Sequence, residues 1–169
     1  MKDKKIFNGV EVIFISTIIL TFISLFNNAF AFFHDQGSLT NRVIEESKKI
    51  IESLFNRVNN ASNNYQNEIS ILNLSMNNTV TMVNKTQEYI EDLKEIISSA
   101  NKITVQEDYK PVLNNYIDSI ENELESYVHY NKYLITGNLT ENQISMDLLS
   151  KAFNYETQAI NEYKKLGLQ

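Results

Sequence analysis

The chain of 169 residues offers few groups for metal or nucleophile chemistry, because it has two histidines and no cysteine. His129 follows Glu125 by four residues, a spacing that places both side chains on one face of a helix. A di-iron carboxylate bundle needs Glu-x-x-His pairs on two helices, and the other histidine, His34, lies at the end of the hydrophobic N-terminal segment. We therefore predict no metal site and no cofactor.

Acidic side chains are the other groups that could do chemistry. They gather in two stretches: Glu88, Glu91, Asp92 and Glu95, and then Asp118, Glu121, Glu123 and Glu125. We interpret both groups as solvated helix faces, since paired acids for hydrolysis also need a cleft. The sequence has no nucleophile–base pattern, phosphate-binding loop or dinucleotide motif. We predict that the protein is not an enzyme.

Tyrosine and asparagine are the remaining candidates for recognition. Seven tyrosines crowd the last 61 residues: Tyr109, Tyr116, Tyr127, Tyr130, Tyr133, Tyr155 and Tyr163. Several follow the apolar positions and are expected to fill a core, whereas Tyr130 and Tyr133 lean away from them and are predicted surface-binding aromatics.

Five Asn-x-Ser/Thr triplets are candidate N-glycosylation sites, and they begin at Asn60, Asn73, Asn77, Asn84 and Asn138. A chain this rich in Asn, Ser and Thr would contain about three such triplets by chance. Asn138 is the strongest candidate, because it lies in a predicted turn.

The first 35 residues are a signal peptide or a membrane anchor. Three lysines precede an apolar run over residues 12–26, and Ala29 and Ala31 suit cleavage before Phe32. Residues 10–33 alternatively form a helix of about 24 residues and roughly 36 Å, long enough to cross a bilayer, although Asn27 and Asn28 would then lie at its lipid-facing end.

A third interpretation rests on Gly9, Val10 and Glu11, which resemble a type IV prepilin processing site. In all three cases the lysines lie on the amino side, and the first basic residue after the apolar run is Arg42. The positive-inside rule then keeps the N-terminus cytoplasmic. Residues 36–169 are therefore predicted to be an extracytoplasmic domain.

Composition limits the partners of that domain. The net charge is -6, and cleavage after Ala31 removes three lysines, Asp3 and Glu11, which leaves -7. This acidity argues against nucleic acid and against anionic lipid. Without cysteine, stability must come from packing rather than disulfides, and the four glycines and one proline indicate a helical domain.

Apolar residues recur at steps of three and four along the whole domain, as in amphipathic helices. Some are eleven apart, as in Leu113, Leu124 and Ile135, or in Ile144, Tyr155 and Leu166. An eleven-residue repeat predicts nearly parallel helices with little supercoil. Any amphipathic helix near 3.6 residues per turn gives a similar pattern, so this interpretation stays open.

Helix ends can be placed from local signals. Thr140 and Gln143 form a predicted capping box, and Gly137 can close the preceding helix in a left-handed conformation. Asp108 is a predicted N-cap that leaves Pro111 in the first turn, where its missing N–H does no harm.

Residues 59–81 are the difficult stretch, because eight asparagines compete with the helix there and residues 72–82 alternate as in a β-hairpin. A break near residues 72–78 would give two helices about as long as the later two. We predict an up-and-down antiparallel bundle of four helices. The alternative is one very long helix packed on two shorter ones.

These observations predict a non-enzymatic interaction or scaffold module, secreted or tethered to the membrane. It would bind a protein partner or a second copy of itself, and contact the membrane through the N-terminal segment if that segment is retained. The alternative is an anchored ligand-binding or sensor-type subunit of a membrane assembly.

Overall fold

The computed structural model describes residues 39–73 and 79–167 of the chain. Four α-helices make up this part: α2 (Leu39–Asn73), α3 (Thr79–Ala100), α4 (Lys110–Thr136) and α5 (Leu139–Leu166), with a 3-10 helix, η1 (Glu107–Tyr109), before α4. The described residues contain no strand, and none of their helices is both long and apolar enough to cross a membrane. The predicted leader, including Ala29, Ala31 and Phe32, lies outside the described residues.

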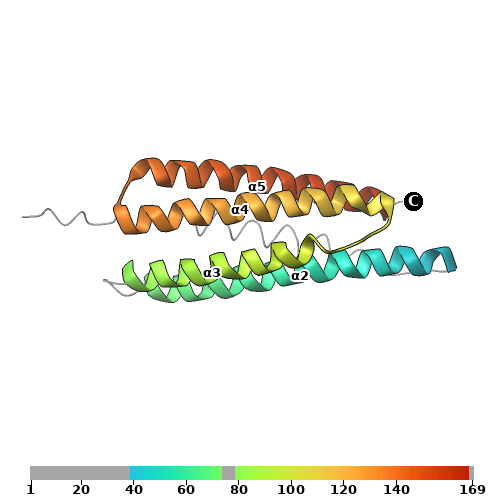
Figure 1. Ribbon diagram of the computed structural model, residues 1–169, viewed down its shortest axis with the longest axis horizontal. Coiled ribbons are helices and arrows are strands. Elements are labelled where there is room, and N and C mark those ends of the chain that lie inside the picture. Colours follow the sequence, from blue (N-terminus) through green and yellow to red (C-terminus); the bar gives the residue numbers. More distant parts are fainter. Residues whose placement is uncertain (1–38, 74–78, 168–169) are drawn as a thin grey trace, which may run out of the picture.

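The helices form two antiparallel hairpins, α2 with α3 and α4 with α5, stacked as two layers (Figure 1). The predicted break is confirmed, since α2 ends at Asn73 and α3 begins at Thr79. The alternative of one very long helix is wrong, because the Tyr65 hydroxyl of α2 lies 3.0 Å from the Thr86 hydroxyl of α3. Two residues 21 positions apart cannot meet along one helix.

Buried positions along α4 recur every seven residues, and some of them also recur every eleven, as Val112, Glu123 and Leu134 do. From η1 through α4 they form three columns: Tyr109, Tyr116, Glu123 and Tyr130; Val112, Ser119, Ser126 and Tyr133; Leu113, Ile120, Tyr127 and Leu134. The expected eleven-residue repeat is wrong at its third member, Ile135, whose side chain is 65% exposed. A seven-residue repeat is the pattern of left-handed knobs-into-holes packing.

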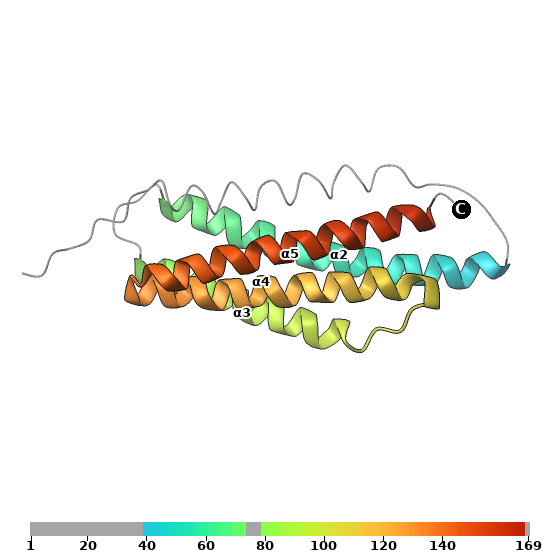
Figure 2. The ribbon, with the colours of Figure 1, turned by 90° about the horizontal axis from the view of Figure 1, so that it is seen from above.

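The layers are joined by aromatic side chains. The Phe55 ring of α2 meets the Tyr116 ring of α4 edge to face at 4.2 Å, and Tyr65 and Tyr127 meet across the layers at 5.2 Å. Figure 2 shows α2 and α5 overlapping when the bundle is seen from above, although the two helices belong to different layers (Figure 1). Close to the C-terminal end of α5, the Tyr163 hydroxyl donates to Glu52 of α2 at 2.8 Å.

Within the upper hairpin, α4 and α5 pack closely because small residues face each other. The Ser119 hydroxyl donates to the Ala152 carbonyl, and the Ser126 hydroxyl donates to the Ser145 carbonyl, each at 2.8 Å. Ala152 and Ala159 are completely buried. These residues leave no room for longer side chains at the α4–α5 contact.

The helix ends are partly as predicted. Gly137 adopts the left-handed conformation (φ 68°) and donates to the Tyr133 carbonyl at 2.7 Å, which confirms the turn. The N-cap of α5 is Asn138 and not Thr140, because the Asn138 side chain accepts from the Thr140 amide at 3.0 Å. Asparagine is the stronger N-cap, so the capping-box prediction is wrong.

At the other end of α4, Pro111 lies in the first turn as expected. Asp108 does not cap this helix. It lies within η1, and Tyr109 occupies the N-cap position without a side-chain hydrogen bond. The extra 3-10 turn has moved the helix start past the predicted cap.

The close α4–α5 contact can be tested by overpacking. Ala152→Leu should reduce the free energy of unfolding by about 1–3 kcal/mol, because the added methylenes have no space. Lys151→Leu introduces the same side chain at the neighbouring exposed position and should change stability by less than about 0.5 kcal/mol. Urea denaturation followed by circular dichroism measures both. Equal effects of the two variants would contradict the packing described here.

Candidate functional site

Glu123 lies in the core and not on a solvated face, so its predicted exposure is wrong. Its side chain is 7% exposed, and its Oε1 accepts a hydrogen bond from the Tyr89 hydroxyl of α3 at 2.7 Å. Burial raises the pKa of Glu123 to about 7, and the hydrogen bond from Tyr89 acts in the opposite direction. Residue 123 belongs to the buried column of Tyr109, Tyr116 and Tyr130, which are seven residues apart, so its side chain faces the core.

A second glutamate, Glu156 of α5, is buried in the same interior. It is 6% exposed and accepts no hydrogen bond from the described residues. Burial raises its pKa to about 9, and the nearby Glu123 carboxylate adds to this. At neutral pH Glu156 is therefore an uncharged carboxylic acid. When the protein unfolds at this pH, Glu123 and Glu156 release protons to the solvent.

Glu125 and His129, which are four residues apart on α4, do not pair. Glu125 is exposed, and His129 instead reaches α5, where its Nδ1 lies 2.6 Å from Glu141 Oε2. Across the described residues, no three His, Asp or Glu side chains converge as metal ligands would. His34 lies outside the described residues.

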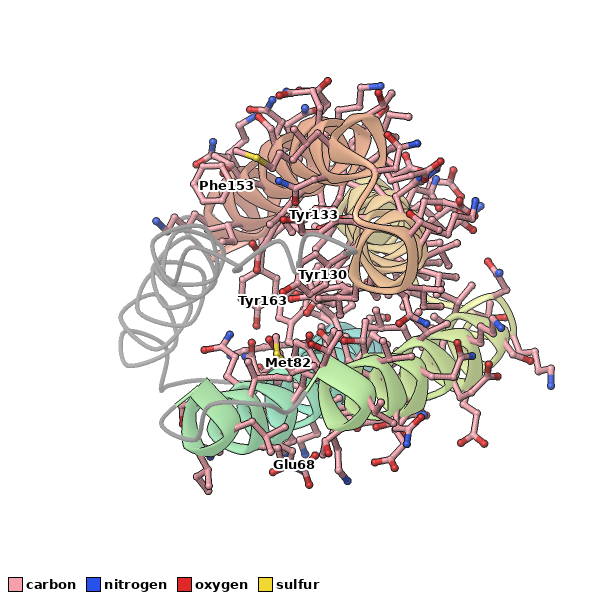
Figure 3. The ribbon with its side chains drawn as sticks, turned by 90° about the vertical axis from the view of Figure 1, so that its left-hand side faces the viewer. Glu68, Met82, Tyr130, Tyr133, Phe153 and Tyr163 are labelled. Atoms are coloured by element: carbon pink, nitrogen blue, oxygen red, sulfur yellow. The ribbon has the colours of Figure 1, made fainter. Side chains whose placement is uncertain are left out.

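The structure contradicts the predicted surface role of Tyr130 and Tyr133. Both are buried, at 4% and 5% exposure, because they occupy heptad columns of α4. Figure 3 shows them on the inner side of α4. Tyr109, Tyr116 and Tyr127 are buried as expected.

Four of the five exposed large aliphatic residues in the described part of the chain lie at one end of the bundle, and the fifth, Ile44, lies near the start of α2. Ile71, Val80, Ile135 and Leu139 are 69%, 75%, 65% and 61% exposed, and they lie near the C-terminus of α2, the N-terminus of α3, the C-terminus of α4 and the N-terminus of α5. These four helix ends all lie at the left in Figure 1. We call this surface, defined by its four residues, the apolar end.

The apolar end is also free of charge. Residues 69–84 and 133–140 contain no Asp, Glu, Lys or Arg. Glu68 and Lys85 flank the first stretch and pair at 3.2 Å. The second stretch is flanked by the exposed Lys132 and by Glu141, which contacts His129. These two uncharged stretches were visible in the sequence, but nothing there showed that they share one end.

Two of the candidate glycosylation sites lie at this same end. Asn138 is exposed in the α4–α5 turn, and Asn73 is the last residue of α2. Asn60 and Asn84 are exposed on α2 and α3, and Asn77 lies outside the described residues. Exposure leaves Asn60, Asn84 and Asn138 accessible to modification, and glycosylation stays a prediction.

Comparison with known proteins finds no matching family model, no similar curated protein and no similar solved structure.

The buried glutamates should make stability depend on pH. The unfolded chain releases these protons near pH 4.5, whereas the fold keeps them to about pH 7 at Glu123 and about pH 9 at Glu156. The unfolded state thus binds fewer protons over this interval, so the free energy of unfolding falls as pH rises. The slope reaches about 1.4 kcal/mol per pH unit for each group.

Melting temperatures recorded by circular dichroism from pH 5 to 9 would measure this dependence. Glu123→Gln should flatten the curve below about pH 7, and Glu156→Gln should flatten it up to about pH 9. Glu121→Gln, at an exposed position of α4, is the control and should leave the slope unchanged. A wild-type curve that rises from pH 5 to 9 would show that the two carboxyls are not held protonated.

Proposed function

We propose that this protein is a non-enzymatic, extracytoplasmic interaction module whose helical bundle self-associates through the apolar end. The observation that carries the proposal is the exposure of Ile71, Val80, Ile135 and Leu139, one from each helix, on a single end. Exposed apolar side chains that gather at one end of a domain are typical of an interaction site.

Charge favours a second copy as the occupant. The chain carries a net charge of -6, so the charged sides of two copies repel each other. The apolar end has no charged residue in its two stretches, and two identical ends can meet around a two-fold axis. This is the surface on which like-charge repulsion is weakest.

The expected affinity is modest. Burying an exposed aliphatic side chain contributes about 1.5–3 kcal/mol at most, and association costs roughly 4–15 kcal/mol of rotational and translational freedom. With four side chains from each copy, the net free energy of association is then a few kcal/mol. This corresponds to a dissociation constant of about 10 μM to 1 mM. Such a contact would be strengthened by tethering many copies on one membrane.

The apolar end would be accessible whether the N-terminal segment is cleaved or retained as a membrane anchor. The start of α2 lies at the opposite end of the bundle (Figure 1), and residues 1–38 are attached there. An anchored protein would therefore present the apolar end away from the membrane, and a secreted one would present it freely.

A second candidate function is an anchored ligand-binding or sensor-type subunit. It is favoured by a groove along the N-terminal half of α2, far from the apolar end. The two functions use different surfaces, so each can be tested without the other.

Self-association can be tested with matched variants. Ile135→Asp should abolish concentration-dependent association in sedimentation equilibrium, because it places like charges against each other at the contact. Ile44→Asp makes the same change at an aliphatic residue, 36% exposed, near the start of α2, and should leave association intact. A wild-type protein that stays monomeric at 1 mM, well within reach of the expected affinity, would contradict the proposal.

The leader is tested by the N-terminus of the protein isolated from its own cells. Cleavage after Ala31 predicts a mature protein that begins at Phe32, whereas an uncleaved anchor predicts Met1 and partition into the membrane fraction. Edman sequencing with an intact mass distinguishes the two. A full-length chain in the soluble cytoplasmic fraction would contradict both, and a mass excess removed by glycosidase would identify occupied sequons.

A further inference from the structure

The groove beside α2 arises from unequal helix lengths. α2 has 35 residues and α3 has 22, so α3 ends while its antiparallel neighbour continues. Residues 103–106 take its place without regular secondary structure. A single non-helical chain is narrower than a helix of about 10 Å diameter, and the difference in width leaves a hollow beside α2.

Two hydrogen bonds hold the end of α3 and the segment that follows it against α2. The Gln106 amide donates to the Ser47 hydroxyl at 3.1 Å, and Arg57 Nη1 donates to the Ser99 hydroxyl at 2.7 Å. The groove therefore has fixed walls on both sides. Its volume is about 530 Å³, within the range of sites that hold small organic ligands.

The walls of the groove combine apolar and charged groups. Ile50, Leu54 and Ile103 provide an apolar surface, and Leu54 is almost completely buried beneath it. Glu46, Lys49 and Arg57 are exposed lining residues, and none of the three forms an ion pair with a described residue. The groove thus offers apolar contact together with charges that a ligand can pair.

The charges are ordered along the helix. Glu46 lies toward the start of α2, Lys49 is one turn further on, and Arg57 lies at the far end. Glu46 and Arg57 are eleven residues apart, which is about 16 Å along a helix. A matching ligand has a cationic group at one end, an anionic group at the other and apolar groups between them.

We infer that this groove binds a short extended peptide with apolar side chains and free charged termini. At about 3.3 Å per residue, five extended residues span the distance from Glu46 to Arg57. The peptide amine pairs with Glu46, the terminal carboxylate pairs with Arg57, which can bind it through two parallel N–H groups, and the side chains contact Ile50 and Ile103.

Calorimetry with defined peptides tests this inference on the full-length protein. The probe is Ala-Val-Ile-Val-Ala with free termini, and the same peptide acetylated and amidated is its uncharged match. The free peptide should bind with a dissociation constant below about 1 mM, and the blocked peptide at least about tenfold more weakly. Equal binding of both peptides, or binding of free valine as tightly as the pentapeptide, would overturn the inference.

Variants then locate the binding site. Arg57→Gln and Glu46→Gln should each weaken binding about fivefold or more, since each removes one charge-paired contact. Lys151→Gln and Glu121→Gln are matched changes at exposed positions away from the groove and should leave binding unchanged. Circular dichroism shows whether each variant is folded. Folded groove variants that bind as tightly as the wild type would overturn the inference, as would the absence of any binding by the free peptide.

Discussion

The seven-residue spacing of buried positions is the constraint on which the rest of this structure depends. A strict heptad keeps one seam of each helix facing its neighbours along its whole length, and every column of α4 follows it for four members. Residues on the seam are buried whatever their polarity. Aliphatic residues off the seam, such as Ile135 and Leu139, remain exposed, and short turns bring them to one end.

The same constraint explains the polar interior. Glu123 and Glu156 occupy seam positions, so the fold buries two carboxyl groups and raises the pKa of each. Burying charge is costly, and a proton removes that cost. Serines on the seam of α4 instead donate to carbonyls of α5, which lets the two helices approach closely and keeps their polar atoms satisfied.

The sequence was sufficient for the helices, their number and the turn at Gly137, because apolar periodicity and glycine conformation are local properties. The sequence did not distinguish a repeat of seven residues from a repeat of eleven. Over a short helix both repeats agree at most positions, and Leu113 fits either. Glu123, Tyr130 and Tyr133 were misplaced because the buried face of α4 is wider than the apolar stripe of the sequence and also holds polar and aromatic residues. The apolar end and the groove depend on which helix ends meet and on unequal helix lengths, and no single stretch of sequence contains that information.

We propose that two copies meet at their uncharged ends rather than along their charged sides. Small-angle X-ray scattering across a concentration series tests it most directly. α2 alone is about 52 Å long at 1.5 Å per residue, so end-to-end association should nearly double the maximum dimension as the mass doubles. A dimer whose maximum dimension stays close to that of the monomer would mean side-by-side packing and would contradict the account.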